Sequence, residues 1–219
     1  MTLSKFYYIN VLCLILFLST GCNRSSVDSA NVESKEIRKE GKEVQEEKVT
    51  PLLTENPVAD PASEESLRQA ALDGIISEVN KYIEAGTIVD ALDPDGHTAL
   101  MFSAFNGHSE IVLKLLKEGA DLEKRDYMGR TALLYACTGP FPETVKILLD
   151  KGAKPNVVDS DEHFSPLMHA AAEGNLNVVK ILIEYGADLS LKDVDGDDAE
   201  SFARQAGHTQ VVDYLHSIR

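Results

Sequence analysis

The feature that most constrains this chain is an internal period of 33 to 34 residues. The aspartates that open successive copies stand 33, 33 and 34 positions apart, at Asp93, Asp126, Asp159 and Asp193. The glycines that close the copies keep the same spacing, at Gly86, Gly119, Gly152 and Gly186. A fixed period of this length indicates a solenoid, in which each small unit stacks on the next.

Each copy predicts two short helices joined by a tight turn. Thr98, Thr131 and Ser165 stand where a hydroxyl can accept from the free N–H groups of a starting helix. Small residues follow, and a glycine such as Gly107 then suits a turn with positive φ. The second helix carries apolar residues at helical spacing. In three copies this stripe comprises Ile111, Val112, Leu115, Leu116; Thr144, Val145, Leu148, Leu149; and Val178, Val179, Leu182, Ile183.

These copies resemble the ankyrin repeat family. The segments that carry the resemblance are Gly96–Leu100 with Gly119–Asp121, Gly129–Leu133 with Gly152–Ala153, and Ser165–Ala171 with Gly186–Asp188. The resemblance covers about residues 64–219. It implies an all-α solenoid of about five helix-turn-helix repeats, with β-turn fingers beside a concave face.

Some copies depart from the pattern. Gly139–Pro142 replaces the usual turn in the third unit, and proline there should shorten or reshape the link between the helices. The fourth unit has one extra residue near Glu162 and lacks the finger glycine, which predicts a wider tip. Residues 64–92 and 193–219 are expected to cap the two ends of a repeat domain at 63–219.

The first 22 residues predict export. Lys5 precedes the thirteen-residue stretch Phe6–Leu18, which is apolar apart from Asn10, too short for a membrane span and suited to a signal peptide at 1–21. Leu18–Cys22 resembles the lipidation box of bacterial lipoproteins, although the leucine stands four residues before the cysteine instead of three. The resemblance implies a lipid anchor at Cys22. An ordinary signal peptide with an incidental cysteine is the alternative.

Residues 22–62 predict a disordered tether, because their apolar residues are few and unpatterned. A coil of about 40 residues has a root-mean-square span of roughly 35 Å. By resemblance to lipoproteins, Asn23 after the cysteine favours an outer membrane, with the protein facing the periplasm. The predicted location is therefore a bacterial cell envelope.

The repeat domain is acidic, with 27 Asp and Glu against 14 Lys and Arg over residues 63–219. This charge repels nucleic-acid phosphates and argues against nucleic-acid binding. It could attract a basic partner or simply maintain solubility, and the sequence favours neither.

The sequence shows no catalytic or metal-binding set. Asp193–Asp198 resembles the start of a calcium loop, but such a loop needs glycine sixth and glutamate twelfth, where this chain has Asp198 and Arg204. The histidines have no ligand spacing, and Cys137 replaces a small buried residue of other copies. We therefore expect no enzyme activity, cofactor, metal or small-molecule substrate.

The family resemblance implies that partner proteins touch the finger tips and the exposed side of each first helix. Carried over by position, the candidate protein-binding residues are Asp95, His97, Phe105, Asn106, Tyr127, Met128, Arg130, Glu162, His163, Phe164 and Glu173. Four of them are large and apolar at positions that are normally solvent-facing: Phe105, Tyr127, Met128 and Phe164. They predict an interaction patch with Arg130 and Glu162 at its rim. Local packing between fingers is the alternative.

Two functions fit these observations. The first is a non-catalytic, lipid-anchored scaffold that binds a partner protein through its finger tips and concave face, with an immunity or accessory role toward an exported enzyme as one form. The second is a structural or stress-protective envelope lipoprotein without a dedicated client.

Overall fold

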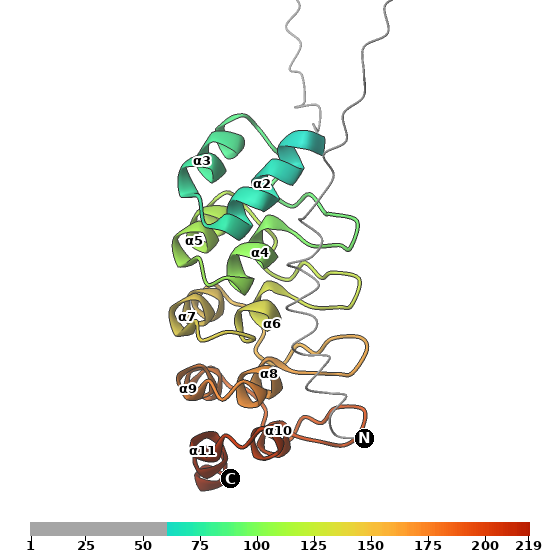
Figure 1. Cartoon of the computed structure of the whole chain (residues 1–219), viewed down its shortest axis with the longest axis vertical. Coiled ribbons are helices and arrows are strands. Elements are labelled where there is room, and N and C mark those ends of the chain that lie inside the picture. Colours follow the sequence, from blue (N-terminus) through green and yellow to red (C-terminus); the bar gives the residue numbers. More distant parts are fainter. Residues whose placement is uncertain (1–60) are drawn as a thin grey trace, which may run out of the picture. The chain divides into compact units, whose positions relative to one another are not determined.

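The structure is a computed structural model that describes residues 61–219 (Figure 1). The predicted signal peptide, Cys22 and nearly all of the predicted tether lie outside these residues. Within the described part the chain forms ten helices and no strand, which confirms the all-α solenoid of five helix pairs. The helices are α2 (Pro61–Asp73), α3 (Ile76–Glu84), α4 (Ala99–Phe105), α5 (Ser109–Lys117), α6 (Ala132–Ala136), α7 (Pro142–Asp150), α8 (Pro166–Ala172), α9 (Leu176–Glu184), α10 (Ala199–Ala206) and α11 (Thr209–Ser217).

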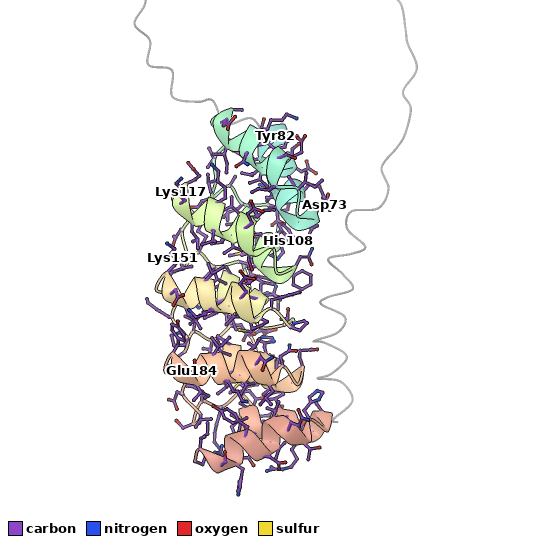
Figure 2. The ribbon with its side chains drawn as sticks, turned by 90° about the vertical axis from the view of Figure 1, so that its left-hand side faces the viewer. Asp73, Tyr82, His108, Lys117, Lys151 and Glu184 are labelled. Carbon is purple, nitrogen blue, oxygen red and sulfur yellow. The ribbon has the colours of Figure 1, made fainter. Side chains whose placement is uncertain are left out.

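The helices of residues 61–219 lie in two rows (Figure 1). The first helices of the pairs, α2, α4, α6, α8 and α10, pack on one another in chain order, and each also packs on its own second helix. The second helices, α3, α5, α7, α9 and α11, form the other row, which faces the viewer in Figure 2. None of these helices is long and apolar enough to cross a membrane.

The core lies between the two rows and follows the predicted stripes. On α5, Ile111, Val112 and Leu115 are buried, whereas Leu113 on the opposite side is 44% exposed. Burying one such side chain stabilises the fold by about 1.5–3 kcal/mol. The first helices bury small residues such as Ala104 and Ala171, which allow neighbouring helices to approach closely.

The helix starts behave largely as predicted. Thr98 accepts a hydrogen bond from Met101 N at 3.3 Å, and Ser165 accepts one from Met168 N at 3.3 Å. Thr131 occupies the same N-cap position, but its side chain makes no such bond. Each hydroxyl cap satisfies one of the N–H groups that a helix start leaves unpaired.

The third unit shows how proline changes the link between the helices. Its first helix, α6, has five residues, compared with seven in α4 and α8. The link to α7 spans residues 137–141, compared with 106–108 in the preceding unit, so the link is reshaped by lengthening and is not shortened. Phe141 stands where other units have His108 or His208, and it packs against Gly107 of the preceding unit. A Cβ on Gly107 would lie 2.2 Å from the Phe141 ring, so only glycine fits there.

Two of the histidines connect consecutive units through hydrogen bonds to the backbone. His108 Nε2 lies 3.0 Å from Leu72 O, and His208 Nε2 lies 2.9 Å from Ala172 O. The Phe141 ring has no nitrogen with which to make the corresponding hydrogen bond. The third unit therefore replaces a hydrogen bond by apolar contact.

The last helix pair closes the stack with charged groups. Glu200 of α10 is buried, and Arg204 and Arg219 both pair with it, the latter through Arg219 Nη1 at 3.1 Å from Glu200 Oε2. Arg219 also reaches Asp198, the N-cap residue of α10. Because these groups stand where another unit would pack, they suit the predicted cap.

Candidate protein-binding surface

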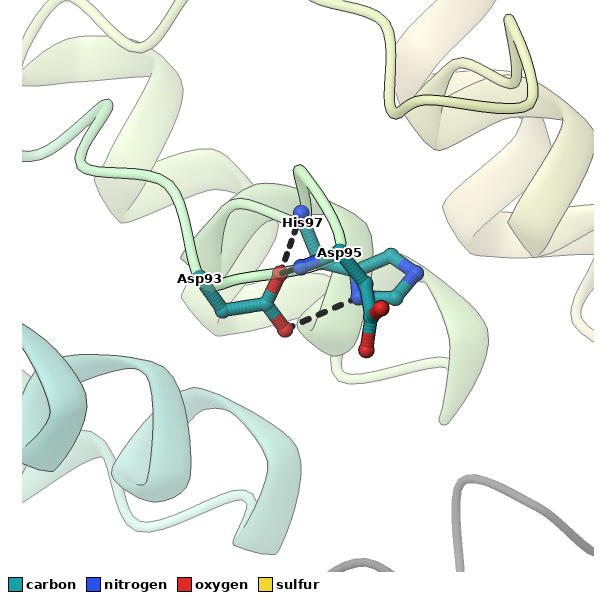
Figure 3. Close-up of side chains that lie close together, drawn as sticks. All are labelled: Asp93, Asp95 and His97. Atoms are coloured by element: carbon teal, nitrogen blue, oxygen red, sulfur yellow. Dashed lines mark hydrogen bonds and ion pairs between the residues drawn. The ribbon is translucent and has the colours of Figure 1, made fainter.

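Each finger is shaped by the aspartate that opens it. In the finger 93–97, Asp93 Oδ1 accepts from the N–H groups of Asp95 at 2.9 Å and His97 at 2.7 Å, and Asp93 N donates to His97 O (Figure 3). The fingers at 126–130 and 193–197 repeat this pattern with Asp126 and Asp193. A short side chain that bonds its own backbone two residues on is a local turn-forming device. The fingers are therefore defined by sequence-local bonds.

The third finger, at residues 159–164 of the fourth unit, is one residue wider, as predicted. Asp159 N donates to Phe164 O, five residues away, whereas the other fingers close over four residues. His163 takes the place of the missing glycine and has a φ of 61°. This left-handed conformation is uncommon for residues other than glycine.

Backbone hydrogen bonds join the fingers into one row. Tyr127 N donates to Asp95 O at 3.3 Å, Ser160 N to Met128 O at 2.8 Å, and Val194 N to Glu162 O at 3.1 Å. Each bond connects one finger to the next along the stack. The finger tips are therefore preorganised with respect to one another, which reduces the ordering that binding requires.

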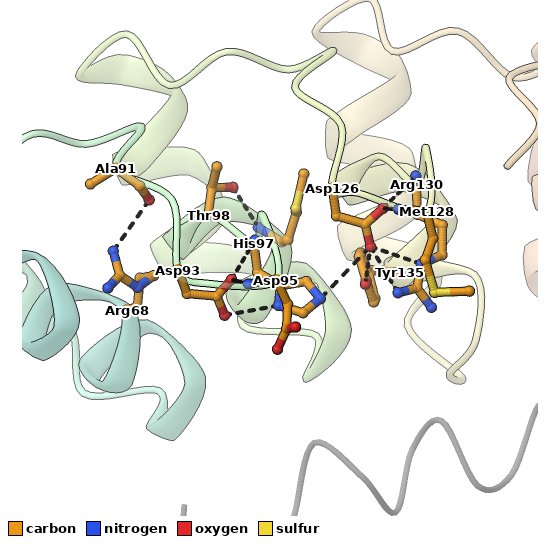
Figure 4. Close-up of polar contacts among 11 residues, drawn as sticks. Arg68, Ala91, Asp93, Asp95, His97, Thr98, Asp126, Met128, Arg130 and Tyr135 are labelled. Atoms are coloured by element: carbon orange, nitrogen blue, oxygen red, sulfur yellow. Dashed lines mark hydrogen bonds and ion pairs between the residues drawn. The ribbon is translucent and has the colours of Figure 1, made fainter. Parts of the chain in front are cut away.

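A buried polar network lies behind the second finger (Figure 4). Asp126 Oδ2 accepts from Arg130 Nε at 2.8 Å and from the Tyr135 hydroxyl at 2.6 Å. His97 approaches from the first finger, with Nδ1 2.8 Å from Asp93 Oδ2 and Nε2 3.7 Å from Asp126 Oδ2. Burial raises the pKa of the Tyr135 hydroxyl, which therefore remains a donor. The network fastens two fingers to the first helices.

Aromatic contacts continue this network along the stack. The His97 ring lies 5.3 Å from the Phe102 ring and 5.8 Å from the Tyr135 ring, and the Arg130 guanidinium lies 4.9 Å from the centre of the Tyr135 ring. Two units beyond His97, Phe164 contacts His169 at 5.6 Å and Phe202 at 5.2 Å, both edge to face. The residue before each of these N-caps thus packs between first helices of neighbouring units.

Three candidate binding residues are in fact part of this interior. The expectation that Phe164 is solvent-facing is wrong: it is 7% exposed because it packs between His169 and Phe202. Arg130 is also 7% exposed, held by Asp126, and does not form a polar rim. His97 is 6% exposed. For these positions the local-packing alternative describes the structure.

The remaining candidates reach the surface to different degrees. Tyr127 is 73% exposed, and Asp95 and His163 are exposed as well. Five others are partly exposed: Phe105, Asn106, Met128, Glu162 and Glu173. Phe105 contacts the Tyr135 ring edge to face at 6.2 Å, and Asn106 Nδ2 donates to Leu72 O at 2.7 Å. Tyr127 is thus the most prominent member of the predicted patch.

Sequence reasoning misses the supporting network, since neither Asp126 nor Tyr135 is among the candidate residues. One sequence signal points to Tyr135. It and His169 share the position four residues after an N-cap, where two other units have phenylalanine, so polar rings replace apolar ones at an aromatic position. His169 is buried, and its Nδ1 has no hydrogen-bond partner. Burial lowers the pKa of His169 to about 4, with nearby Arg130 as a second cause.

One group within residues 61–219 has the composition of a metal site. Asp93, Asp95 and His97 place ligand atoms within 4.8 Å of one another. However, both Asp93 oxygens already accept hydrogen bonds that shape the finger (Figure 3). The group is therefore explained by the finger fold. Cys137, the free cysteine of the described part, is fully buried, and burial raises the pKa of its thiol.

Comparisons with known proteins match the repeats. A family described as ankyrin repeats in three copies matches residues 67–159 and, overlapping them, 141–218. Over 51 residues the chain is 41% identical to an ankyrin repeat protein of Rickettsia bellii, a match that covers 23% of this chain and 30% of that protein. Over 49 residues it is 41% identical to the Notch-regulated ankyrin repeat-containing protein of Xenopus tropicalis, covering 22% and 43%. The chain thus spans less than half the length of either relative.

Proposed function

From the premise that this chain belongs to the ankyrin repeat family, whose repeats are protein-binding scaffolds, we propose that it holds a partner protein at a bacterial envelope membrane. The partner contacts the row of finger tips and the adjoining side of the first helices. The hydrogen-bonded finger row carries this proposal, because it presents a rigid surface on which Tyr127 projects into solvent. Catalysis has no part in it.

The location belongs to the same proposal and rests on the sequence. A signal peptide at 1–21 exports the chain, Cys22 receives lipid, and residues 23–62 separate the stack from an outer membrane facing the periplasm. More than one acyl chain on Cys22 would give stable anchoring, whereas a single chain gives marginal binding. The anchor concentrates the stack near the membrane, where an accessory or immunity role toward an exported enzyme would operate.

Site-specific photo-crosslinking tests the binding surface. A photoreactive amino acid replaces Tyr127 in the full-length chain, and a matched variant carries it at Leu113, which is exposed on the second-helix side. We expect one partner to be crosslinked from position 127 and not from position 113. Equal capture from both positions, or none from 127, would contradict the proposed surface and favour an envelope component without a dedicated client.

The anchor is tested separately with Cys22→Ser. We expect the wild-type chain to incorporate radioactive palmitate and to sediment with membranes. The variant should lose the label. An unlabelled wild-type protein that is released in soluble form would instead indicate an ordinary signal peptide.

A further inference from the structure

Among the tyrosines of residues 61–219, Tyr127 alone has no side-chain hydrogen bond and no cation–π contact with a charged group. Each of the other four makes such a contact: Tyr82 with Lys81, Tyr135 with Arg130 and Asp126, Tyr185 with Asp150, and Tyr214 with Lys180. Two of these pairs place a lysine over the ring, at 5.0 Å for Tyr82 and 5.5 Å for Tyr214. Tyr127 is also the most exposed large apolar side chain of the described part, at 73%.

The fingers on either side of Tyr127 each contribute an exposed acidic residue. Its backbone N–H bonds Asp95 O, and a Cβ added to Gly96 would lie 3.1 Å from its ring atom Cδ1, so the ring lies against the first finger. On the other side, Ser160 N bonds Met128 O, which brings the Ser160–Asp161 tip next to Tyr127. The first finger presents Asp95 and the fourth unit presents Asp161, both exposed.

These two carboxylates form no ion pair within residues 61–219. Figure 3 shows the Asp95 carboxylate without a bond to Asp93 or His97, which bond each other. The nearest cation in sequence to Tyr127 is the exposed Arg125, whose Nη1 donates to the backbone carbonyls of Gly129 at 3.1 Å and Val158 at 3.2 Å. Arg130 lies three residues away, but it is buried and held by Asp126. The tip therefore offers an aromatic face and two negative charges to solvent.

The wider charge distribution points the same way. The four finger segments, 93–97, 126–130, 159–164 and 193–197, contain nine acidic residues and one basic residue, the buried Arg130. The five second helices contain seven acidic and five basic residues. Negative charge is thus concentrated on the side that the fingers occupy. Such a surface steers a positively charged partner toward the fingers.

We propose that Tyr127, Asp95 and Asp161 receive an arginine side chain from a basic segment of the partner protein. A guanidinium is planar and stacks on an aromatic face, while its N–H groups donate to carboxylates. Lysine would satisfy the charges but would not stack its head group in the same way. This inference rests on the proposed protein-binding function and specifies the chemistry of the partner.

The test uses the processed chain, from residue 22 onward and with Cys22→Ser, and two fluorescent peptides that differ at one position. The first is Ser-Gly-Ser-Arg-Ser-Gly-Ser, and the second carries citrulline, the neutral analogue of arginine. NMR titration of the ¹⁵N-labelled protein should show shifts near Asp95, Tyr127 and Asp161 with the arginine peptide. The citrulline peptide should bind about tenfold more weakly, as expected for loss of a charge-assisted bond.

Matched variants separate this site from general attraction to an acidic protein. Tyr127→Ala, and the pair Asp95→Asn with Asp161→Asn, should each weaken arginine-peptide binding by about tenfold. The control pair Glu110→Gln with Asp213→Asn makes the same change in net charge on exposed second-helix positions and should keep wild-type binding. Equal loss in both pairs, or equal binding of both peptides, would overturn the arginine site. Circular dichroism checks that each variant remains folded.

Failure of the arginine site can be distinguished from failure of the proposed protein-binding function. A partner that crosslinks from position 127 as efficiently after Asp95→Asn and Asp161→Asn would overturn the arginine site and leave the scaffold function standing. Arginine-specific peptide binding without any crosslinked partner would support the site and count against the client-binding function.

Discussion

The finger side and the second-helix side of this chain both contain ion pairs between residues four apart, but they place them differently. Asp126 and Arg130 pair at 2.8 Å with side chains that are 1% and 8% exposed, whereas Lys114 and Glu118 pair at 3.0 Å with side chains that are 27% and 33% exposed. A buried charge depends on its partner, because water cannot replace it. An exposed pair contributes little, because water and salt screen it. Similar spacing therefore has different consequences on the two sides.

The two sides also differ in what supports them. The second helices are held by an apolar stripe that includes Leu115, and their charges project outward. The fingers expose apolar side chains such as Tyr127 and Val194 and have no comparable buried stripe of their own. They depend on aspartate-centred bonds and on the network around Asp126 (Figure 4). The second-helix side thus supplies much of the core, and the finger side holds polar groups in fixed positions.

The largest effect is expected from Leu115→Asp. A carboxylate at this fully buried position would lose the apolar burial and remain unpaired, at a cost of more than about 4 kcal/mol. Urea unfolding followed by circular dichroism measures the change. The control is Leu113→Asp on the same helix, where the side chain is 44% exposed and stability should change little. Equal stability of the two variants would refute the assignment of the buried stripe.

A smaller but still large loss is expected from Asp126→Asn. The substitution keeps an oxygen for the finger N–H groups but leaves buried Arg130 without its counter-charge, at a cost of about 3–5 kcal/mol. Glu118→Gln breaks the exposed pair with Lys114 and should cost about 0.2–1 kcal/mol. Chemical denaturation compares the two. Similar losses would show that the buried pair is not the specific support of the fingers.

The third prediction concerns the stability of the fold at acidic pH. Because burial holds the pKa of His169 near 4, compared with 6.5 in its ordinary state, the unfolded chain takes up this proton first as the pH falls. The contribution of neutral His169 to the free energy of unfolding is therefore complete above about pH 6.5. It is lost as the pH falls toward 4, by up to about 3 kcal/mol. Unfolding free energies of wild type and His169→Phe, measured from pH 7 to pH 4, test this.

Phenylalanine is the matched replacement for His169, because Phe102 and Phe202 occupy the same position in other units. The variant should lose this part of the pH dependence. Burial raises the pKa values of Asp159 and Glu173, so these groups contribute in the opposite direction and should do so in both proteins. If the two proteins lose stability in parallel between pH 6.5 and 4, His169 is not the responsible group.

The stack is predictable from the sequence because each unit is specified by local signals. Thr98, Ser165 and the closing glycines mark the ends of elements, and the stripe around Leu115 marks the buried face. The wider third finger is also predictable, since an inserted residue has a direct effect on the backbone. The prolines at 140 and 142 mark the altered link after α6, but they do not predict that this link is longer.

The candidate surface is predicted less well, because a place in the repeat pattern does not give the contacts of a side chain. Phe164 and Arg130 occupy the position just before an N-cap, which looks exposed when one unit is considered alone. In the folded stack, Phe202 of the next unit packs on Phe164, and the Tyr135 ring lies beside Arg130. Burial at this position therefore depends on tertiary contacts. Tyr127 projects from the tip, beyond those contacts, and remains exposed.

The extra residue in the third finger shows where this chain can change length. Asp159 still accepts from the backbone of its own finger, and Val194 still bonds Glu162, so the added residue leaves the connections to neighbouring units in place. Length variation at a tip is thus separated from the helices that maintain the stack. A descendant of this protein could gain, lose or exchange tip residues, and thereby meet a different partner, while inheriting the same framework.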